Sequence, residues 1–262
     1  MNDQIEQAAE GVAPEQTPVS DEAALPDTVT GAPDVVVITG ACGTLGRAVA
    51  RAFEAAGASL VLLDLKQASL NAAFGANGPR QWAQAVDLLD AAQTSAALQA
   101  ALARFGHIDV LCNIAGGFQM GDPVHLLSDQ TWDMMLDLNA RTVLHTVRAV
   151  VPGMIAAGAG KIVNVGAFAA LRGAPDMSAY GVSKSAVMRM TEALSGELRE
   201  HGINVNAVLP TIIDTPENRR GMPDADPSRW VAPDDLAQVI LFLASDAARA
   251  IHGALLPVTG LS

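Results

Sequence analysis

A run of β-branched residues leads into a glycine-rich turn in the stretch Val35-Val36-Val37-Ile38-Thr39-Gly40-Ala41-Cys42-Gly43-Thr44-Leu45-Gly46. An apolar run without polar alternation predicts a strand that is buried on both faces of a parallel sheet. The alanine-rich segment 45–56 follows at once and predicts a helix. The stretch therefore predicts a strand, a tight turn and a helix, the first unit of an α/β sheet.

The same alternation continues to the end of the chain. Further strand-like runs are expected at 59–63, 84–86, 109–114, 161–165, 204–209 and 255–258, and further helices at 91–105, 132–157 and 179–201. Continuous apolar strands separated by helices predict a doubly wound (Rossmann-type) parallel sheet with helices on both faces. We expect one α/β domain over residues 34–262.

The first 33 residues differ in composition from the rest. Residues 1–33 hold seven carboxylates, four prolines and no Lys or Arg, while the whole chain has a net charge of −12. Such a segment is typical of a disordered acidic tail. The acidic chain argues against nucleic acid as a partner, and no apolar stretch is long enough to span a membrane.

The cysteines and histidines give no sign of a metal centre. Cys42 and Cys112 have neither disulfide-framework nor metal-binding spacing, which favours a reducing, cytoplasmic setting. The five histidines form no metal-binding pair. We therefore expect no metal in this protein.

The glycine-rich turn is a candidate dinucleotide site. Gly40, Gly43 and Gly46 permit a tight turn and a close approach of the backbone to a pyrophosphate, at the N-terminus of the following helix. Asp64 ends the second predicted strand, 18 residues after Gly46, where a carboxylate accepts hydrogen bonds from the adenosine ribose. A 2′-phosphate would be repelled there, which favours NAD over NADP, although nearby Lys66 softens the discrimination.

Tyr180 and Lys184 form a candidate proton-transfer pair. Four residues on a helix bring both side chains to one face, and an ammonium beside a phenol favours the phenolate. A core tyrosine followed by a solvent-facing lysine is the alternative for this spacing taken alone.

The motifs together resemble the short-chain dehydrogenase/reductase family over residues 34–262. The resemblance is carried by Thr39-Gly40, Gly43, Gly46, Asp64, Asp87-Leu88, Asn113-Ile114-Ala115-Gly116, Asn139, Tyr180, Lys184 and Pro210 with Thr215. It implies a single domain with a seven-stranded parallel sheet, assembled as a homodimer or homotetramer. It also implies a hydride transfer in which Tyr180 moves the proton, Lys184 binds the nicotinamide ribose hydroxyls and lowers the Tyr180 pKa, and Asn139 holds a water. Tyr180 and Lys184 are thus expected to bind the cofactor as well.

The resemblance assigns further positions to the cofactor. Thr44 and Leu45 lie in the phosphate-binding turn, Asp87 and Leu88 are expected at the adenine, and Asn113, Ala115 and Gly116 pass beside the cofactor. Pro210, Ile213 and Thr215 are expected near the nicotinamide, the last two at its carboxamide.

The chain departs from the family pattern at Ala167, where the family carries a serine that donates a hydrogen bond to the substrate. Loss of one such donor typically lowers a rate by about 100- to 1000-fold. Ser178 and Ser183 are nearby alternatives for the missing hydroxyl. Thr44 and Thr211 also replace glycines of the common pattern.

Quinonoid dihydropteridine reductases within this family are similar at several of these positions. They also carry alanine at position 167, and segment 214–230 resembles their substrate lid. In this comparison Phe118 is expected to stack on a flat ring, and Arg219 on the lid is a candidate substrate-binding residue.

Three functional hypotheses follow. The favoured one is an NAD(H)-dependent reductase of a quinonoid dihydropterin or similar conjugated ring. The second is a general alcohol dehydrogenase or ketone reductase, and the third is a low-activity dinucleotide-binding sensor or scaffold.

Overall fold

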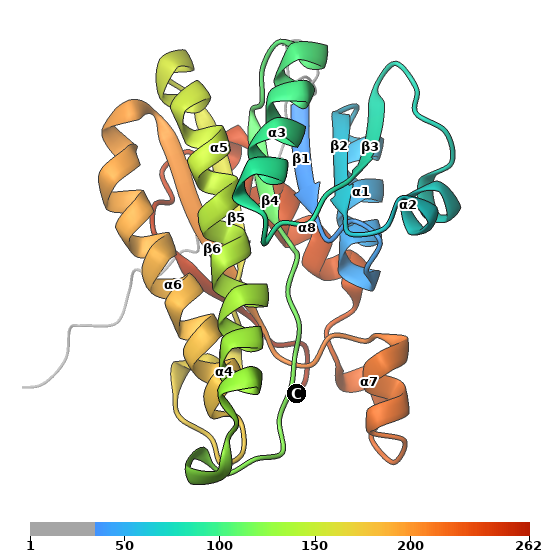
Figure 1. Cartoon of the computed structure of the whole chain (residues 1–262), viewed down its shortest axis with the longest axis vertical. Coiled ribbons are helices and arrows are strands. Elements are labelled where there is room, and N and C mark those ends of the chain that lie inside the picture. Colours follow the sequence, from blue (N-terminus) through green and yellow to red (C-terminus); the bar gives the residue numbers. More distant parts are fainter. Residues whose placement is uncertain (1–34) are drawn as a thin grey trace, which may run out of the picture. The chain divides into compact units, whose positions relative to one another are not determined.

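The computed structural model describes residues 35–262, which build one parallel sheet of seven strands. The strands are β1 (Val35–Thr39), β2 (Ser59–Asp64), β3 (Gln81–Ala85), β4 (Val110–Asn113), β5 (Gly160–Val165), β6 (Ile203–Pro210) and β7 (Leu255–Val258). Their order is β3-β2-β1-β4-β5-β6-β7 (Figure 1). The predicted doubly wound α/β fold is confirmed. The predicted tail, 1–33, lies outside the described residues.

The strand order reverses between β1 and β4. In the register of the sheet, Val37 of β1 pairs with Val61 of β2 on one side and with Leu111 of β4 on the other. The chain therefore leaves β1 and β4 at neighbouring places on the same edge of the sheet. This point is where doubly wound sheets bind ligands, outside the carboxyl ends of their strands.

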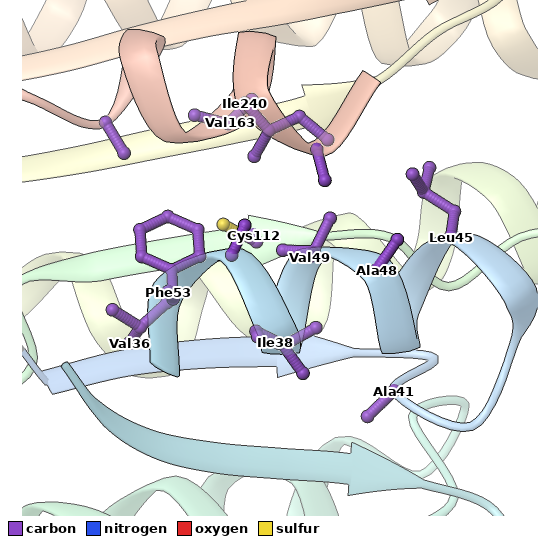
Figure 2. Packing of buried hydrophobic residues seen from close by; sticks show 14 of the residues in the cluster. Val36, Ile38, Ala41, Leu45, Ala48, Val49, Phe53, Cys112, Val163 and Ile240 are labelled. Carbon is purple, nitrogen blue, oxygen red and sulfur yellow. The ribbon is translucent and has the colours of Figure 1, made fainter. Parts of the chain in front are cut away.

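Helices cover both faces of the sheet. One face carries α1 (Thr44–Ala55) and α8 (Pro233–Leu243), with α2 (Gln67–Phe74) beside them. Figure 2 shows Val49 and Phe53 of α1 on the side that faces Ile240 of α8. The other face carries α3 (Ala91–Phe105), α5 (Thr142–Ala157) and α6 (Ser178–Leu198). Because both faces are covered, the central strands are mostly apolar, and their polar residues such as Asn113 and Asn164 are buried.

The third strand and the helix predicted over 132–157 differ from the sequence prediction in their extent. The third strand is 81–85 rather than 84–86, because an edge strand is only half buried and contains Gln81 and Trp82 instead of an apolar run. The helix expected over 132–157 consists of α4 (Asp129–Leu136), a π-helical turn (Asp137–Arg141) and α5. A π-turn leaves no hydrophobic period in the sequence, so the pattern did not reveal it.

The short helix α7 (Pro216–Gly221) follows β6, in the segment expected to form a surface loop. Within residues 35–262, no helix has both the length and the apolar character needed to cross a membrane.

Candidate active site

The turn after β1 needs glycine at two places. Gly40 has φ +62°, and a side chain on it would come within 2.8 Å of the Ala115 backbone. A Cβ on Gly46 would lie 2.2 Å from the carbonyl oxygen of Gly40. The turn is closed by a hydrogen bond from the Gly43 N–H to the Gly40 carbonyl, 3.1 Å long. Thr44 therefore begins α1 without opening the turn, so the missing middle glycine is tolerated.

The N-terminus of α1 is built to receive an anion. Within the described residues, no side chain caps this helix end, where Gly43 is the N-cap residue and the helix begins at Thr44. The first N–H groups of a helix lack partners inside the helix, and the helix dipole favours negative charge beside them. A helix of 12 residues with a bare first turn and a closely approachable backbone fits a pyrophosphate.

Asp64 lies beside this turn, held by two backbone donors. Its Oδ2 accepts a hydrogen bond from the Cys42 N–H at 2.9 Å, and its Oδ1 accepts one from Leu65 at 2.8 Å. Both oxygens keep acceptor capacity for ribose hydroxyls. Burial, together with the charge of Asp64, raises the pKa of the Cys42 thiol to about 11, so this cysteine stays protonated at neutral pH.

The two residues expected at the adenine differ in orientation. Asp87 is half buried and accepts a hydrogen bond from the Leu89 N–H at 2.9 Å. The Leu88 side chain is buried in the core on the α3 and α5 face, and its carbonyl oxygen lies 2.8 Å from Nδ1 of His145. Leu88 can therefore meet a ligand only through its backbone.

The loop after β4 is fixed to the first strand by Thr39. The Thr39 hydroxyl oxygen accepts hydrogen bonds from the Ile114 and Ala115 N–H groups, at 3.0 and 3.1 Å. Asn113 turns inward, where its amide donates to Asn164 at 2.8 Å and its oxygen accepts from Thr146 at 2.7 Å. Its side chain therefore supports the loop from the interior. The sequence placed Thr39 in the turn motif but assigned it no role, and the structure shows that it holds the loop after β4.

Asn139 connects this loop to α6. Its side-chain oxygen accepts a hydrogen bond from the Gly117 N–H at 2.9 Å, while its amide donates to the Gly117 carbonyl at 3.1 Å and to the Ser183 hydroxyl at 2.9 Å. The π-helical turn that contains Asn139 is buried at this residue. The expected water-binding role of Asn139 stays a prediction.

Lys184 reaches the same place from α6. Its ammonium donates a hydrogen bond to the Val165 carbonyl at the end of β5, 2.8 Å away. A Cβ on Gly116 would lie 3.2 Å from the Lys184 nitrogen and 2.7 Å from the Asn139 oxygen, so the bare glycine lets the three groups meet. Burial lowers the pKa of Lys184 to about 8, because the charged form loses its water.

Tyr180 differs from the expectation in its ionisation. Burial raises the pKa of its phenol to about 12, whereas a neighbouring lysine was expected to lower it. Burial of the phenol is the cause of this shift, while the Lys184 ammonium donates its hydrogen bond to the Val165 carbonyl. The Tyr180 ring contacts Phe118 edge to face, with ring centroids 4.8 Å apart and planes at 79°. Tyr180 is thus a neutral phenol against an aromatic neighbour.

The substrate-facing side has no hydroxyl at the position of Ala167. This methyl is buried in a small cluster with Met188 and Leu209, packed against Tyr180. The Ser183 hydroxyl is engaged with Asn139 and donates to the Tyr180 carbonyl at 2.8 Å. Ser178 lines a separate cavity of about 10 Å³ with residues 119–122, and its buried oxygen has no partner among the described residues. The structure therefore shows neither serine in the role of the missing donor.

The lid segment pairs its own charges. Arg219 donates two hydrogen bonds to Asp214, at 2.6 and 2.7 Å, which lowers the pKa of that carboxyl. Thr215 caps α7 by accepting from the Asn218 N–H at 3.1 Å, and the Asn218 amide donates to the Ile213 carbonyl at 2.8 Å. Arg219 is therefore paired with Asp214, and its candidate substrate-binding role stays a prediction. Thr215 and Ile213 are bound by Asn218 within the segment that follows β6.

A phosphate-binding turn, a carboxylate at the second strand and a buried lysine beside a tyrosine define a nicotinamide-dependent oxidoreductase. The model of the short chain dehydrogenase family matches residues 34–225. The chain belongs to this short-chain dehydrogenase/reductase family, as the motifs predicted.

The similar proteins are named as dehydrogenases and reductases. The chain is 34% identical over 238 residues to a D-threitol dehydrogenase of Mycolicibacterium smegmatis, covering 86% of this chain and 91% of that protein. It is 33% identical over 236 residues to a cis-4-hydroxycyclohexanecarboxylate dehydrogenase of Sinomonas cyclohexanicum, covering 86% and 95%. A 3-ketoacyl-(acyl-carrier-protein) reductase of Brucella melitensis, solved with NADH, matches with a TM-score of 0.78 and 32% identity, over 87% and 97% of the chains.

These comparisons establish an enzyme that binds NAD(P), and they bear on the three hypotheses. The sensor hypothesis gains nothing from relatives that are named as dehydrogenases and reductases. None of the relatives named above is a dihydropteridine reductase, so the favoured pterin substrate is unsupported. The alcohol dehydrogenase hypothesis fits the relatives better.

Proposed function

We propose that this protein interconverts a secondary alcohol and its ketone, with NAD(H) as the hydride carrier. One observation carries the proposal: the Lys184 ammonium and the Asn139 amide oxygen both lie close to Gly116, and Tyr180, on the same helix as Lys184, contacts Phe118 on that loop. The relatives, which by name act on a polyol and on a cyclic alcohol, support the same reaction class.

The cofactor would be held by residues along the carboxyl edge. Gly40, Gly43, Gly46 and the first turn of α1 would bind the pyrophosphate, and Asp64 the adenosine ribose. When bound, the nicotinamide supplies or accepts the hydride. We propose a preference for NADH because the carboxylate of Asp64 would repel a 2′-phosphate.

Tyr180 would transfer the proton. A phenol with a pKa of about 12 carries its proton at neutral pH, so it can donate to a carbonyl oxygen as that oxygen gains negative charge. The carbonyl carbon gains the hydride, the carbonyl oxygen gains the phenol proton, and the product is the alcohol. Lys184, with a pKa near 8, can return a proton towards the phenolate in the physiological range.

A second candidate substrate is favoured by Ala167. A conjugated imine such as a quinonoid dihydropterin accepts hydride readily and depends less on a hydrogen-bond donor. The buried methyl of Ala167 and the Phe118 ring beside Tyr180 suit such a ring. We further propose that the protein is cytoplasmic and forms a homodimer or homotetramer. Size-exclusion chromatography with light scattering tests the oligomeric state.

The proposal is tested by NADH oxidation with cyclohexanone, dihydroxyacetone and a quinonoid dihydropterin, in the wild type and Tyr180→Phe. Removal of the phenol hydroxyl should lower kcat for ketones by roughly 100- to 10,000-fold. NADH binding, measured by fluorescence titration, should change little, since the phenyl ring retains the packing against Phe118. Pterin turnover without ketone turnover would favour the second candidate. Ketone turnover that is equal in both proteins would contradict the assigned role of Tyr180.

A further inference from the structure

Four large apolar side chains remain exposed on two loops at the carboxyl edge. Phe118 is 55% exposed and Met120 54% exposed on the loop after β4, while Phe168 is 40% and Leu171 48% exposed on the turn after β5. We call these four residues the apolar rim. Phe118 touches Tyr180, and Phe168 and Leu171 lie on the turn that follows Ala167, so these exposed apolar side chains border the candidate site and favour an apolar ligand there.

Both loops are anchored beside Tyr180. Phe118 touches the Tyr180 ring, and the Gly121 N–H donates to the Asp176 carbonyl at 2.9 Å, just before α6 begins. The turn with Phe168 and Leu171 follows Ala167 directly and is held by the Ser185 hydroxyl, which donates to the Ala170 carbonyl at 2.9 Å. The apolar rim is therefore held next to the proton donor by fixed backbone contacts.

Two positions next to Tyr180 offer no free hydroxyl group. Ala167 offers a methyl, and the Ser183 hydroxyl is taken up by Asn139 and the Tyr180 carbonyl. Arg219, the cation predicted for this side, is bound to Asp214. A polyol brings several hydroxyls that need hydrogen-bond partners when they leave water, and a hydroxyl left without a partner in an apolar site weakens binding.

We infer that the substrate of this site carries an apolar body, a cyclic or aryl hydrocarbon next to the reacting carbon, and that the apolar rim selects it over polyols. This inference rests on the proposed alcohol–ketone reaction and specifies its substrate. The hydrocarbon would cover Phe118 and its neighbours as the carbonyl approaches Tyr180. The selection comes from the removal of apolar surface from water.

The test compares three ketones at fixed NADH: cyclohexanone, dihydroxyacetone and acetone, which lacks both a hydrocarbon body and hydroxyls. We expect kcat/KM for cyclohexanone to exceed that for dihydroxyacetone by about 10- to 100-fold, mainly through KM. Equal or better use of dihydroxyacetone would overturn the inference while leaving the proposed reaction intact. Absence of turnover with every ketone would instead overturn the proposed function.

Variants of Phe118 separate selection from general damage. Phe118→Ala should raise KM for cyclohexanone by about 10-fold, change KM for acetone far less, and Phe118→Leu should restore most of the loss. Leu102→Ala is the matched control, because Leu102 is 41% exposed on α3 and belongs to neither loop. An equal rise in KM for acetone and cyclohexanone would show that Phe118 only supports Tyr180, and would overturn the selection.

Discussion

The carboxyl edge of the sheet has two halves of different chemistry, one that we propose binds the cofactor and one that we propose binds the substrate. We call them the cofactor-facing half and the substrate-facing half. After β1 and β2, backbone N–H groups and the carboxylate of Asp64 are fixed by hydrogen bonds around a bare helix end. After β4 and β5, the groups near Tyr180 are a buried methyl at Ala167 and exposed apolar side chains such as Phe118. The first half is suited to a charged, polar molecule, and the second offers an apolar surface.

The difference separates what the fold imposes from what the chain adds. A pyrophosphate can be bound by backbone, so glycines and a helix end suffice, as the turn at Gly40 and Gly46 shows. Substrate recognition depends on side chains on loops, which vary without disturbing the sheet. Substitutions in the two halves should therefore have different kinds of effect.

The largest change is expected from a polar group added to the apolar half. Ala167→Ser supplies the missing donor and should raise kcat for ketones by roughly 100-fold, since one donor to a developing oxyanion is worth about 100- to 1000-fold. The serine fits because only one atom is added. Ala170→Ser, on the following turn, is the control in steady-state assays. An unchanged or lower kcat would show that position 167 does not face the reacting oxygen.

Lys184, where the two halves meet, should produce a pH-dependent stability. Its folded pKa of about 8 lies below the ordinary 10.5, so the unfolded chain binds more protons between these values and stability rises with pH there. Relative to Lys184→Met, the wild type should gain about 1 to 2 kcal/mol of unfolding free energy between pH 7.5 and 9.5. Urea titrations at both pH values measure it. A parallel pH dependence in the two proteins would contradict burial of the charge.

The cofactor-facing half should respond through cofactor choice. Asp64→Asn removes the negative charge but keeps an oxygen for the Cys42 N–H, so the turn should persist. The ratio of the NADPH to the NADH dissociation constant should fall by roughly 10-fold, because the repulsion of a 2′-phosphate is lost. Fluorescence titration of both cofactors gives the ratio. A ratio that stays constant would mean that Asp64 does not face the ribose.

The smallest effect is expected on the lid. Arg219 is bound to Asp214 on an exposed surface, so Arg219→Ala should change KM for ketones by less than about fivefold. Steady-state assays with cyclohexanone measure the change, with Arg220→Ala on the same helix as the control. A much larger rise in KM, confined to Arg219→Ala, would return this residue to the substrate site.

The sequence predicted the sheet and the candidate centre well because both depend on local patterns. Apolar runs located six of the seven described strands, all but β3, and Tyr180 and Lys184 lie four residues apart on α6, as the spacing predicted. The edge strand at Gln81 escaped because half-burial leaves no apolar run. The pairing of Asn139 with Gly117 escaped because it depends on a π-turn and a distant loop.

Charge states and pairings were harder to predict than positions. The pKa of Tyr180 was expected to fall, but burial raises it, and burial depends on the whole packed structure. The pairing of Arg219 with Asp214 was not predicted, because a sequence does not show which charged side chains meet, and the candidate substrate role of Arg219 stays a prediction. Spacing along the chain indicates which groups can meet, while the fold decides how strongly solvent and neighbours act on them.

In the proposed mechanism, Tyr180 donates the proton without the hydrogen-bond donor that the family usually carries at position 167. The most direct test is a kinetic double-mutant cycle of Tyr180→Phe and Ala167→Ser, with kcat for cyclohexanone reduction as the readout. If the mechanism is correct, Ala167→Ser increases kcat when Tyr180 is present and restores little of kcat in the Tyr180→Phe background. Full activity in Tyr180→Phe, or an equal gain from Ala167→Ser in both backgrounds, would contradict it.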